Sequence, residues 1–266
     1  MMAIHRFAAA LAVAALLALA TNASLAKDAS DAQAEPEIVA QDWSFNGPFG
    51  TFDQGQLQRG YKVYREVCSN CHSMRLLSYR NLAEPNGPEL SPAAVEALAA
   101  EAEVTDGPND KGEMFKRPGR PSDPFRSPFP NPEAARAANN GALPPDLSVI
   151  AKAREGGPDY IHALLTGYHA APAGFPLTQG MQYNTAFPGH QIAMPPPLSD
   201  GVVTYTDGTK PTLDNYAKDV SAFLMWTAEP KLEERKETGF KVMIFLIVLA
   251  AMLYFTKRRV WSNVAH

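Results

Sequence analysis

The sequence predicts a mainly α-helical protein, with long proline-rich loop insertions in an exported domain and one transmembrane helix at the C-terminus. Three observations lead to this fold class. An apolar block with a basic start opens the chain, two internal segments place apolar residues at helical spacing, and a second apolar block lies near the end. The 266 residues, of which 45% are hydrophobic and 20% charged, are enough for one sizeable core.

Residues 1–26 are predicted to be a cleaved signal peptide. Arg6 precedes an uncharged run over residues 7–20, and residues 24–26 place small side chains at both positions that signal peptidase reads. A buried N-terminal helix is the alternative, but it would not require a lone cation before an Ala/Leu block. We therefore expect residues 27–238 to form a domain outside the cytoplasm.

Two amphipathic helices are expected in this domain. In residues 53–68, Asp53 is the expected N-cap and apolar side chains recur at spacings of four, three and four. These side chains are Leu57, Tyr61, Tyr64 and Cys68. Gly60 lowers the helix propensity of this segment but permits close approach by another helix. Residues 211–230 repeat the helical pattern, so we expect the two helices to cross.

The only two cysteines of the chain, Cys68 and Cys71, stand two residues apart and directly before His72. A disulfide here would close a very small loop, and no βαβ pattern supports a thioredoxin-like site. Zinc would need a second ligand pair. CxxCH is the signature of covalent haem attachment, in which two thiols bind the porphyrin vinyl groups and the histidine reaches the iron. The motif predicts one covalently bound haem c.

The sixth iron ligand decides between electron transfer, which needs a strong-field ligand, and ligand chemistry at an open iron. The candidates are Met114, Met181, Met194, Met225, His162, His169 and His190. Met194 is favoured because residues 195–197 are three prolines, which stiffen the chain and hold a ligand with little entropy to lose. Met181 is its nearest rival.

Residues 239–256 are predicted to be a transmembrane anchor. Residues 242–255 carry no charge, and the flanking positions bring the run close to the roughly 20 residues that a bilayer needs. A buried core helix is the alternative, but three cations at 257–259 and interfacial aromatic side chains favour the membrane. The numbers of Lys and Arg residues before and after this segment are nearly equal, so the positive-inside rule does not set the orientation. The predicted export of the N-terminus sets it instead. Residues 257–266 are expected to form a cytoplasmic tail.

The exported domain is acidic, with a net charge of −9 over residues 27–238. This charge argues against nucleic acid as a partner and favours a basic protein partner. Residues 84–113 alone carry a net charge of −7 and are a candidate docking surface, although a charged insertion with no docking role fits the same pattern.

Two further segments differ from this helical pattern. Residues 117–145 contain eight prolines, a composition typical of a linker, although Phe125 and Phe129 provide apolar anchors. Residues 201–211 are the best hairpin candidate, with a turn at Asp207-Gly208.

Several blocks resemble one family in a consistent order. They include VCSNCHSM, GEMFKRPGR, ANNGALPPDL, KAREGGPDY and IAMPPPL, followed by one anchor. From about Trp43 to Trp261 the chain resembles bacterial members of the cytochrome c1 family, the haem c subunit of the quinol–cytochrome c oxidoreductase (bc1) complex. The resemblance implies a class I cytochrome c-like haem domain and makes the proline-rich segment an ordered wrap over the haem.

The resemblance also implies the site residues. It makes Cys68 and Cys71 the thioether positions, His72 the proximal iron ligand and Met194 the distal one. It places three further residues at the haem edge near the propionates: Asn139, Arg154 and Tyr160. Some bacterial relatives hold the distal side with an extra cysteine pair, and this chain has no cysteine left for one.

The implied function is a one-electron relay without independent catalysis. The resemblance names the Rieske iron–sulfur protein as donor, a soluble or membrane-tethered c-type cytochrome as acceptor, and cytochrome b as a further partner in a dimeric complex. It implies a single-pass protein of the bacterial inner membrane with its haem domain in the periplasm. Two other classes remain open: a haem enzyme such as a peroxidase, and an anchor subunit whose haem only stabilises the fold.

Overall fold

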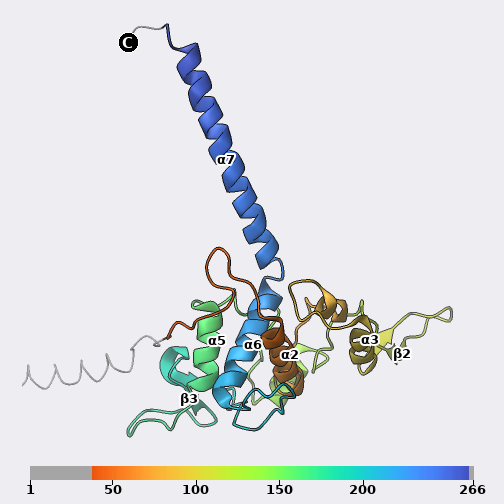
Figure 1. Ribbon diagram of the computed structural model, residues 1–266. Helices are drawn as coiled ribbons and strands as arrows, with labels where there is room; N and C mark the ends of the chain where they lie inside the picture. The colour runs from red at the N-terminus through yellow and green to blue at the C-terminus, as the bar shows by residue number, and fades with distance from the viewer. Residues whose placement is uncertain (1–37, 264–266) are drawn as a thin grey trace, which may run out of the picture.

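The computed structural model describes residues 38–263, which form a mainly helical domain from which one long helix projects (Figure 1). The predicted signal peptide, residues 1–26, lies outside the described residues. The mainly helical fold class is confirmed.

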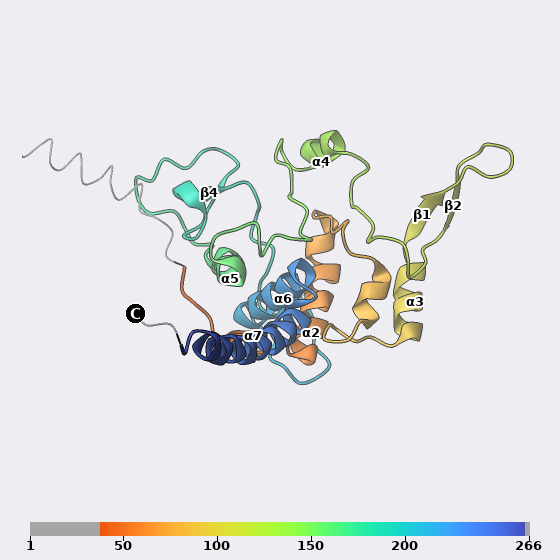
Figure 2. The ribbon, with the colours of Figure 1, turned by 90° about the horizontal axis from the view of Figure 1, so that it is seen from above.

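The centre of the domain is a crossed helix pair, α2 (Gln54–Glu66) and α6 (Leu213–Ala228), as the sequence predicts. Asp53 caps α2 by accepting a hydrogen bond from the backbone N–H of Gln56 at 2.6 Å. Gly60 lies at the crossing, where a Cβ atom would overlap the carbonyl oxygen of Asp219 and lie 2.6 Å from Cβ of Phe223. Helix α5 (Gly157–Thr166) packs on the other side of α6 (Figure 2).

An aromatic core fills the space around this pair. The rings of Tyr64 and Phe223 lie 5.9 Å apart, and Trp226 packs on Phe223 at 5.7 Å. Phe125, from the proline-rich segment, lies 6.1 Å from Tyr64 and 4.7 Å from Tyr79. The phenylalanine anchor at position 125 therefore ties this loop to the helix pair.

An acidic lobe, defined here as residues 79–118, lies beside α2 and shares its hydrophobic core. It contains the 3-10 helix η2 (Tyr79–Ala83), α3 (Pro92–Ala100) and an antiparallel hairpin of β1 (Glu103–Asp106) and β2 (Phe115–Pro118). Arg117 links this hairpin to the segment that follows it, since it bonds Asp106 of β1 at 2.5 Å and Asp123 at 2.6 Å. The proline-rich segment that follows has one short helix, α4 (Pro132–Ala138), capped by Asn131.

The hairpin predicted at residues 201–211 is wrong: this described segment contains no strand. Its side chains bond the helix pair instead of pairing with one another. The Tyr205 hydroxyl donates to Asp219 at 2.7 Å, and Arg59 bonds Asp207 at 2.8 Å. The short ribbon of β3 (Gln182–Tyr183) and β4 (Gln191–Ile192), with η3 (Pro188–His190) between them, lies earlier in the chain.

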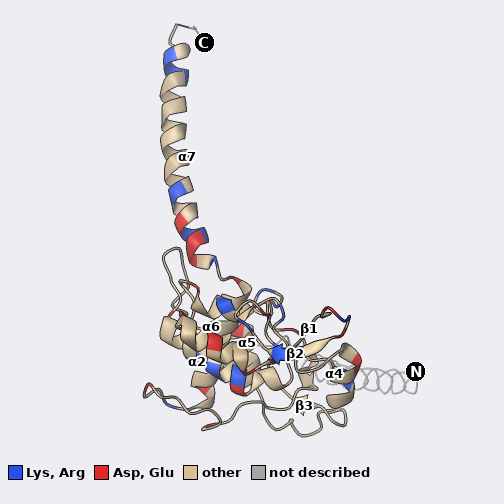
Figure 3. Cartoon of the chain, turned by 90° about the vertical axis from the view of Figure 1, so that its right-hand side faces the viewer, with Lys and Arg blue, Asp and Glu red and all other residues tan. Residues whose placement is uncertain are grey.

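Helix α7 (Leu232–Val260) contains the predicted anchor and extends beyond it at both ends. Among the described residues it is the one helix long and apolar enough to cross a membrane. Its 29 residues correspond to about 44 Å at 1.5 Å per residue. Figure 3 shows charged residues near both ends of α7 and none along its middle, as expected of a transmembrane helix.

Candidate haem site

The CxxCH motif begins where α2 ends. Val67 is the C-cap of α2, and Cys68–Asn70 form one 3-10 turn, η1. Side chains of this turn satisfy the last carbonyl groups of α2: Ser69 Oγ donates to Arg65 O at 2.6 Å, and Asn70 Nδ2 donates to Glu66 O at 3.1 Å. The turn then closes through the N–H groups of residues 71 and 72, which both donate to Cys68 O.

Both cysteine thiols are free, as covalent haem attachment requires. Cys68 packs against the hydrophobic core, and burial raises the pKa of its thiol to about 12. Cys71 is exposed. The pair therefore stands at the boundary between core and surface, where one porphyrin edge could lie on both thiols.

The imidazole of His72 is oriented by a backbone carbonyl. Its Nδ1 lies 2.8 Å from Pro145 O, and the carbonyl can only accept, so Nδ1 carries the proton. Nε2 is then left with the lone pair that iron coordination needs. Burial lowers the pKa of His72, although the Pro145 carbonyl and Asp146 oppose this shift. The lowered pKa favours the neutral ring.

Asp146 joins the His72 loop to the Pro145 loop. Its Oδ2 accepts from Ser73 Oγ at 2.7 Å and from the backbone N–H of Arg75 at 3.0 Å. Its Oδ1 accepts from the backbone N–H of Ser148 at 3.0 Å. The backbone adds a further bond between the two loops, from residue 147 to residue 73 at 2.8 Å. These bonds fix the position of the carbonyl that orients His72.

Met194, the predicted distal ligand, is held through its backbone. The hydroxyl of Tyr168 donates to Met194 O at 3.1 Å, just after the end of α5. Burial raises the pKa of Tyr168, so this donor stays protonated at neutral pH. The three prolines after Met194 restrict the chain on the other side. Tyr168 thus supplies an anchor near Met194, in a chain whose two cysteines both belong to the CxxCH motif.

Several rival ligands have other roles in the structure. His162 Nε2 is 2.9 Å from Asp214 Oδ1, and His190 Nδ1 is 3.2 Å from Asn184 O. Met225 packs against the core within α6, and Met114 is 60% exposed in the β1–β2 connection. Met181, half-buried before β3, remains the main alternative.

The three residues expected near the propionates lie in different settings. Arg154 is exposed and Tyr160 is buried. Burial raises the pKa of the Tyr160 phenol, and the positive charge of Arg154 opposes this shift. Of these two residues, Arg154 carries the charge that could pair with a propionate. Asn139 is the C-cap of α4, and its Nδ2 donates to Ala135 O at 2.7 Å, so its amide is partly committed to the helix. Contact of any of the three with haem stays a prediction.

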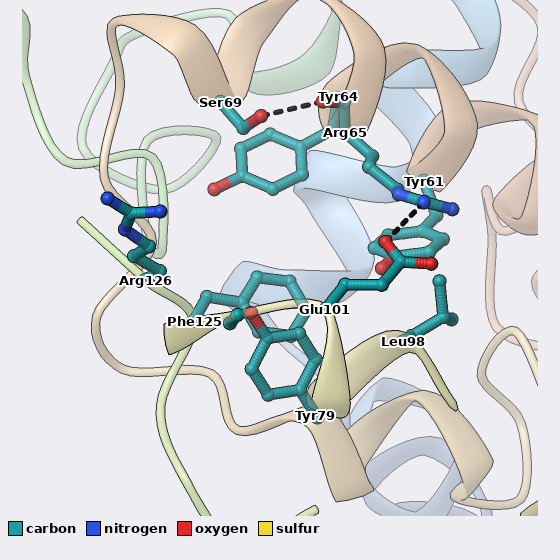
Figure 4. Close-up of a pocket in the computed structure, with 10 residues that line it drawn as sticks. Tyr61, Tyr64, Arg65, Ser69, Tyr79, Leu98, Glu101, Phe125 and Arg126 are labelled. Carbon is teal, nitrogen blue, oxygen red and sulfur yellow. Dashed lines mark hydrogen bonds and ion pairs between the residues drawn. The ribbon is translucent and has the colours of Figure 1, made fainter. Parts of the chain in front are cut away.

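A cavity of about 190 Å³ lies between α2 and the acidic lobe (Figure 4). Four of its ten lining residues are aromatic, Tyr61, Tyr64, Tyr79 and Phe125, and Arg65 and Glu101 form an ion pair at 2.6 Å in its wall. None of the predicted iron ligands or thioether cysteines lines it. We therefore do not assign this cavity to the haem.

Comparison with known proteins decides the family. The model of the cytochrome c1 family matches residues 43–264. The chain belongs to the cytochrome c1 family. Cytochrome c1 of Rhodospirillum rubrum is 49% identical over 85% of this chain and 88% of its own length. The mitochondrial haem protein cytochrome c1-2 of Solanum tuberosum is 48% identical over 88% of this chain and 89% of its own length.

A third relative is longer. Cytochrome b/c1 of Bradyrhizobium diazoefficiens is 50% identical over 96% of this chain, which spans 40% of that protein's length. Membership of the cytochrome c1 family, with relatives named as haem proteins, identifies this chain as a membrane-associated haem c protein. It also implies an electron-transfer role in the bc1 complex.

Sequence reasoning did not identify Pro145, Asp146 or Tyr168 as residues that hold the segments of His72 and Met194. Pro145 and Asp146 stand in the quoted block ANNGALPPDL, and Tyr168 closes the segment LLTGY. Nothing in a single sequence shows that these blocks contact the motifs at 72 and 194, because the contacts span 73 and 26 residues.

Proposed function

We propose that this chain relays single electrons from the Rieske iron–sulfur protein to a c-type cytochrome, with His72 and Met194 as axial iron ligands. The haem c supplies reversible one-electron exchange at iron when it is bound. The protein supplies the ligands, their orientation and a shielded setting. The hydrogen bond between His72 Nδ1 and Pro145 O carries this proposal.

This bond supports a relay because it fixes both the tautomer and the ring direction. A histidine so held donates Nε2 to iron with little reorganisation between oxidation states. On the distal side, the backbone of Met194 is held by Tyr168, so the thioether does not depend on a flexible loop. A thioether ligand raises the reduction potential, which suits an acceptor from a high-potential donor.

We further propose that the haem domain faces the periplasm of a bacterial cell and that cytochrome b lies beside α7 in a dimeric complex. The signal peptide predicted at residues 1–26 supports export, and the cations at residues 257–259 support a cytoplasmic end. Protease added to sealed right-side-out vesicles should cleave the haem domain. Protection of the domain there would contradict this orientation.

The acidic lobe is the proposed docking surface for a basic cytochrome. Part of its charge is already compensated, because Glu101, Glu103 and Asp106 form ion pairs with Arg65, Lys116 and Arg117. The unpaired carboxylates therefore carry the long-range attraction. The rate of cytochrome reduction should fall as ionic strength rises; a rate independent of salt would remove this lobe from the docking surface.

The ligand assignment is tested by substitution at two methionines. Met194→Leu should lower the midpoint potential and allow carbon monoxide to bind the reduced protein, because the sixth position opens. Met181→Leu is the matched control and should change neither property. The result would be read by redox titration and visible spectra of the detergent-solubilised holoprotein.

One result would refute the relay, and another would refute the assignment of Met194. Carbon monoxide binding by the unchanged protein would indicate an open iron and would favour the haem-enzyme class. If Met181→Leu lowered the midpoint potential and Met194→Leu did not, the distal ligand would be Met181.

A further inference from the structure

Residues 44–52, called here the 44–52 loop, form an uncharged segment between Asp42 and Asp53. Its sequence is SFNGPFGTF, with three phenylalanines in nine residues. Phe45 and Phe52 are buried at 5% and 9% exposure, but Phe49 is 78% exposed. The loop therefore uses two of its aromatic side chains in the core and presents the third outward.

The exposed ring contacts the long helix. Phe49 meets Phe240 of α7 edge-on, with the ring centroids 6.0 Å apart and an interplanar angle of 70°. Phe240 is itself 55% exposed. Figure 1 shows the orange loop rising beside the base of α7, on the side of the domain from which the helix projects. An exposed aromatic pair thus joins the loop to the helix.

The first turns of α7 hold the loop in this position. Lys236 Nζ donates to the carbonyl oxygens of Phe45 and Gly50, at 2.7 and 2.8 Å. Glu233 Oε1 accepts from the backbone N–H of Phe52 at 2.8 Å. A side chain at position 50 would overlap the loop backbone, with Phe45 C 2.6 Å from its Cβ, so glycine is required there. These contacts fix where Phe49 points.

The level of Phe240 indicates what surrounds Phe49. The uncharged run of α7 covers residues 242–255, about 21 Å at 1.5 Å per residue, and a hydrocarbon core is about 30 Å thick. Phe240, two residues before this run, must then lie close to the membrane boundary on the domain side. A ring in contact with Phe240 lies at the same level, where aromatic side chains are enriched.

We propose that the tip of the 44–52 loop, Pro48 and Phe49, inserts into the lipid interface beside α7. The proposal rests on α7 spanning the membrane and is independent of the axial ligands. The lipid surface is favoured as the occupant because the site is continuous with the exposed face of the anchor and the loop carries no charge to desolvate. The loop would give the domain a second membrane contact and restrict its rotation about α7.

The test uses single cysteines labelled with a nitroxide in the full-length holoprotein, reconstituted in lipid vesicles. Both native cysteines are engaged when haem c is attached, so an introduced cysteine is labelled alone. Phe49→Cys is the test variant, Phe240→Cys the reference at the boundary, and Met114→Cys the water-exposed control. Met114 is 60% exposed in the β1–β2 connection. In Figure 2 the β1–β2 hairpin lies away from α7, on another side of the domain.

Collision rates with oxygen, which concentrates in lipid, and with a water-soluble nickel chelate would be measured for each label. At positions 49 and 240 we expect oxygen collisions to exceed nickel collisions, with the ratio inverted at position 114. A water-like ratio at position 49 would overturn the proposal. The same measurement in the assembled complex adds a second test: a label at position 49 that neither reagent reaches would show that another subunit, rather than lipid, covers the loop.

Discussion

Replacing Gly60 with alanine tests whether the close crossing of α2 and α6 stabilises the haem domain. A Cβ atom at position 60 would overlap Asp219 O and lie 2.6 Å from Cβ of Phe223. Both obstructing atoms belong to the backbone or to the root of a side chain, so no rotamer change can relieve them. The two helices would have to move apart along their most extensive contact.

The size of the effect follows from two opposing contributions. Overpacking of a core costs about 1–3 kcal/mol, and the fixed obstructing atoms place this site at the upper end. Alanine gains back about 1 kcal/mol of helix propensity relative to glycine. The net loss in the free energy of unfolding is therefore about 2 kcal/mol. For a domain of this size, that loss lowers Tm by about 4–8 °C.

Gly55→Ala is the matched control on the same helix. A Cβ atom there would lie 3.4 Å from Asp53 Oδ1 and 3.5 Å from Arg59 Nη1, which are ordinary contacts. We expect this variant to gain up to about 1 kcal/mol from helix propensity alone. Thermal unfolding of both holoproteins, followed by far-UV circular dichroism, separates the two contributions.

The reasoning would be refuted by a Gly60→Ala variant that keeps or raises the Tm of the unchanged protein, as Gly55→Ala is expected to do. That result would mean that the helices separate at no cost, so glycine at the crossing would have no packing role.

Three further predictions concern charged side chains. Asp146→Asn should lower Tm by several degrees and shift the midpoint potential, because the amide NH2 would replace one of the two accepting oxygens and would face an N–H or O–H donor instead. Spectra and redox titration of the variant would show an unchanged potential if the network does not orient His72. Asp123 bonds Arg117, which lowers the pKa of its carboxyl to about 2 from 3.8. The ionised Asp123 carboxylate contributes its full stability above about pH 4, and this contribution is lost as pH falls through about 2. The difference in Tm between the unchanged protein and Asp123→Asn should therefore vanish over that range. A constant difference would contradict this reasoning. Arg154→Gln should lower the midpoint potential, since a nearby cation disfavours the ferric state; an unchanged potential would place Arg154 away from the haem.

The crossed helix pair was predictable because its signals are local. Asp53 is an N-cap, apolar residues follow the helical period, and a glycine interrupts the pattern where another backbone must approach. The apolar run of α7 is equally local, since length and the absence of charge suffice to indicate a membrane helix. The start of α7 at Leu232 was not predicted. The residues before the apolar run are mostly charged, so they carry no apolar pattern that would mark them as part of the helix.

The hairpin expected at residues 201–211 failed for a physical reason. Asp207-Gly208 has good turn chemistry, but turn chemistry does not determine what the flanking residues bond. Tyr205 and Asp207 bond Asp219 and Arg59 of the helix pair, and these long-range partners outcompete strand pairing. The hairpin that does form, β1–β2, lies in the acidic lobe, where Arg117 of β2 bonds Asp106 of β1.

The sequence by itself determined the chemistry of the site: two thiols and an imidazole at CxxCH spacing identify haem c, and a methionine before three prolines is the favoured sixth ligand. Only the tertiary structure decided how these groups are held. Pro145 O, Asp146 and Tyr168 reach the ligand loops from distant parts of the chain. The residues that attach haem are neighbours in the sequence, so a motif identifies them. The orientation of His72 and Met194 depends on hydrogen bonds between segments that only the folded chain brings together.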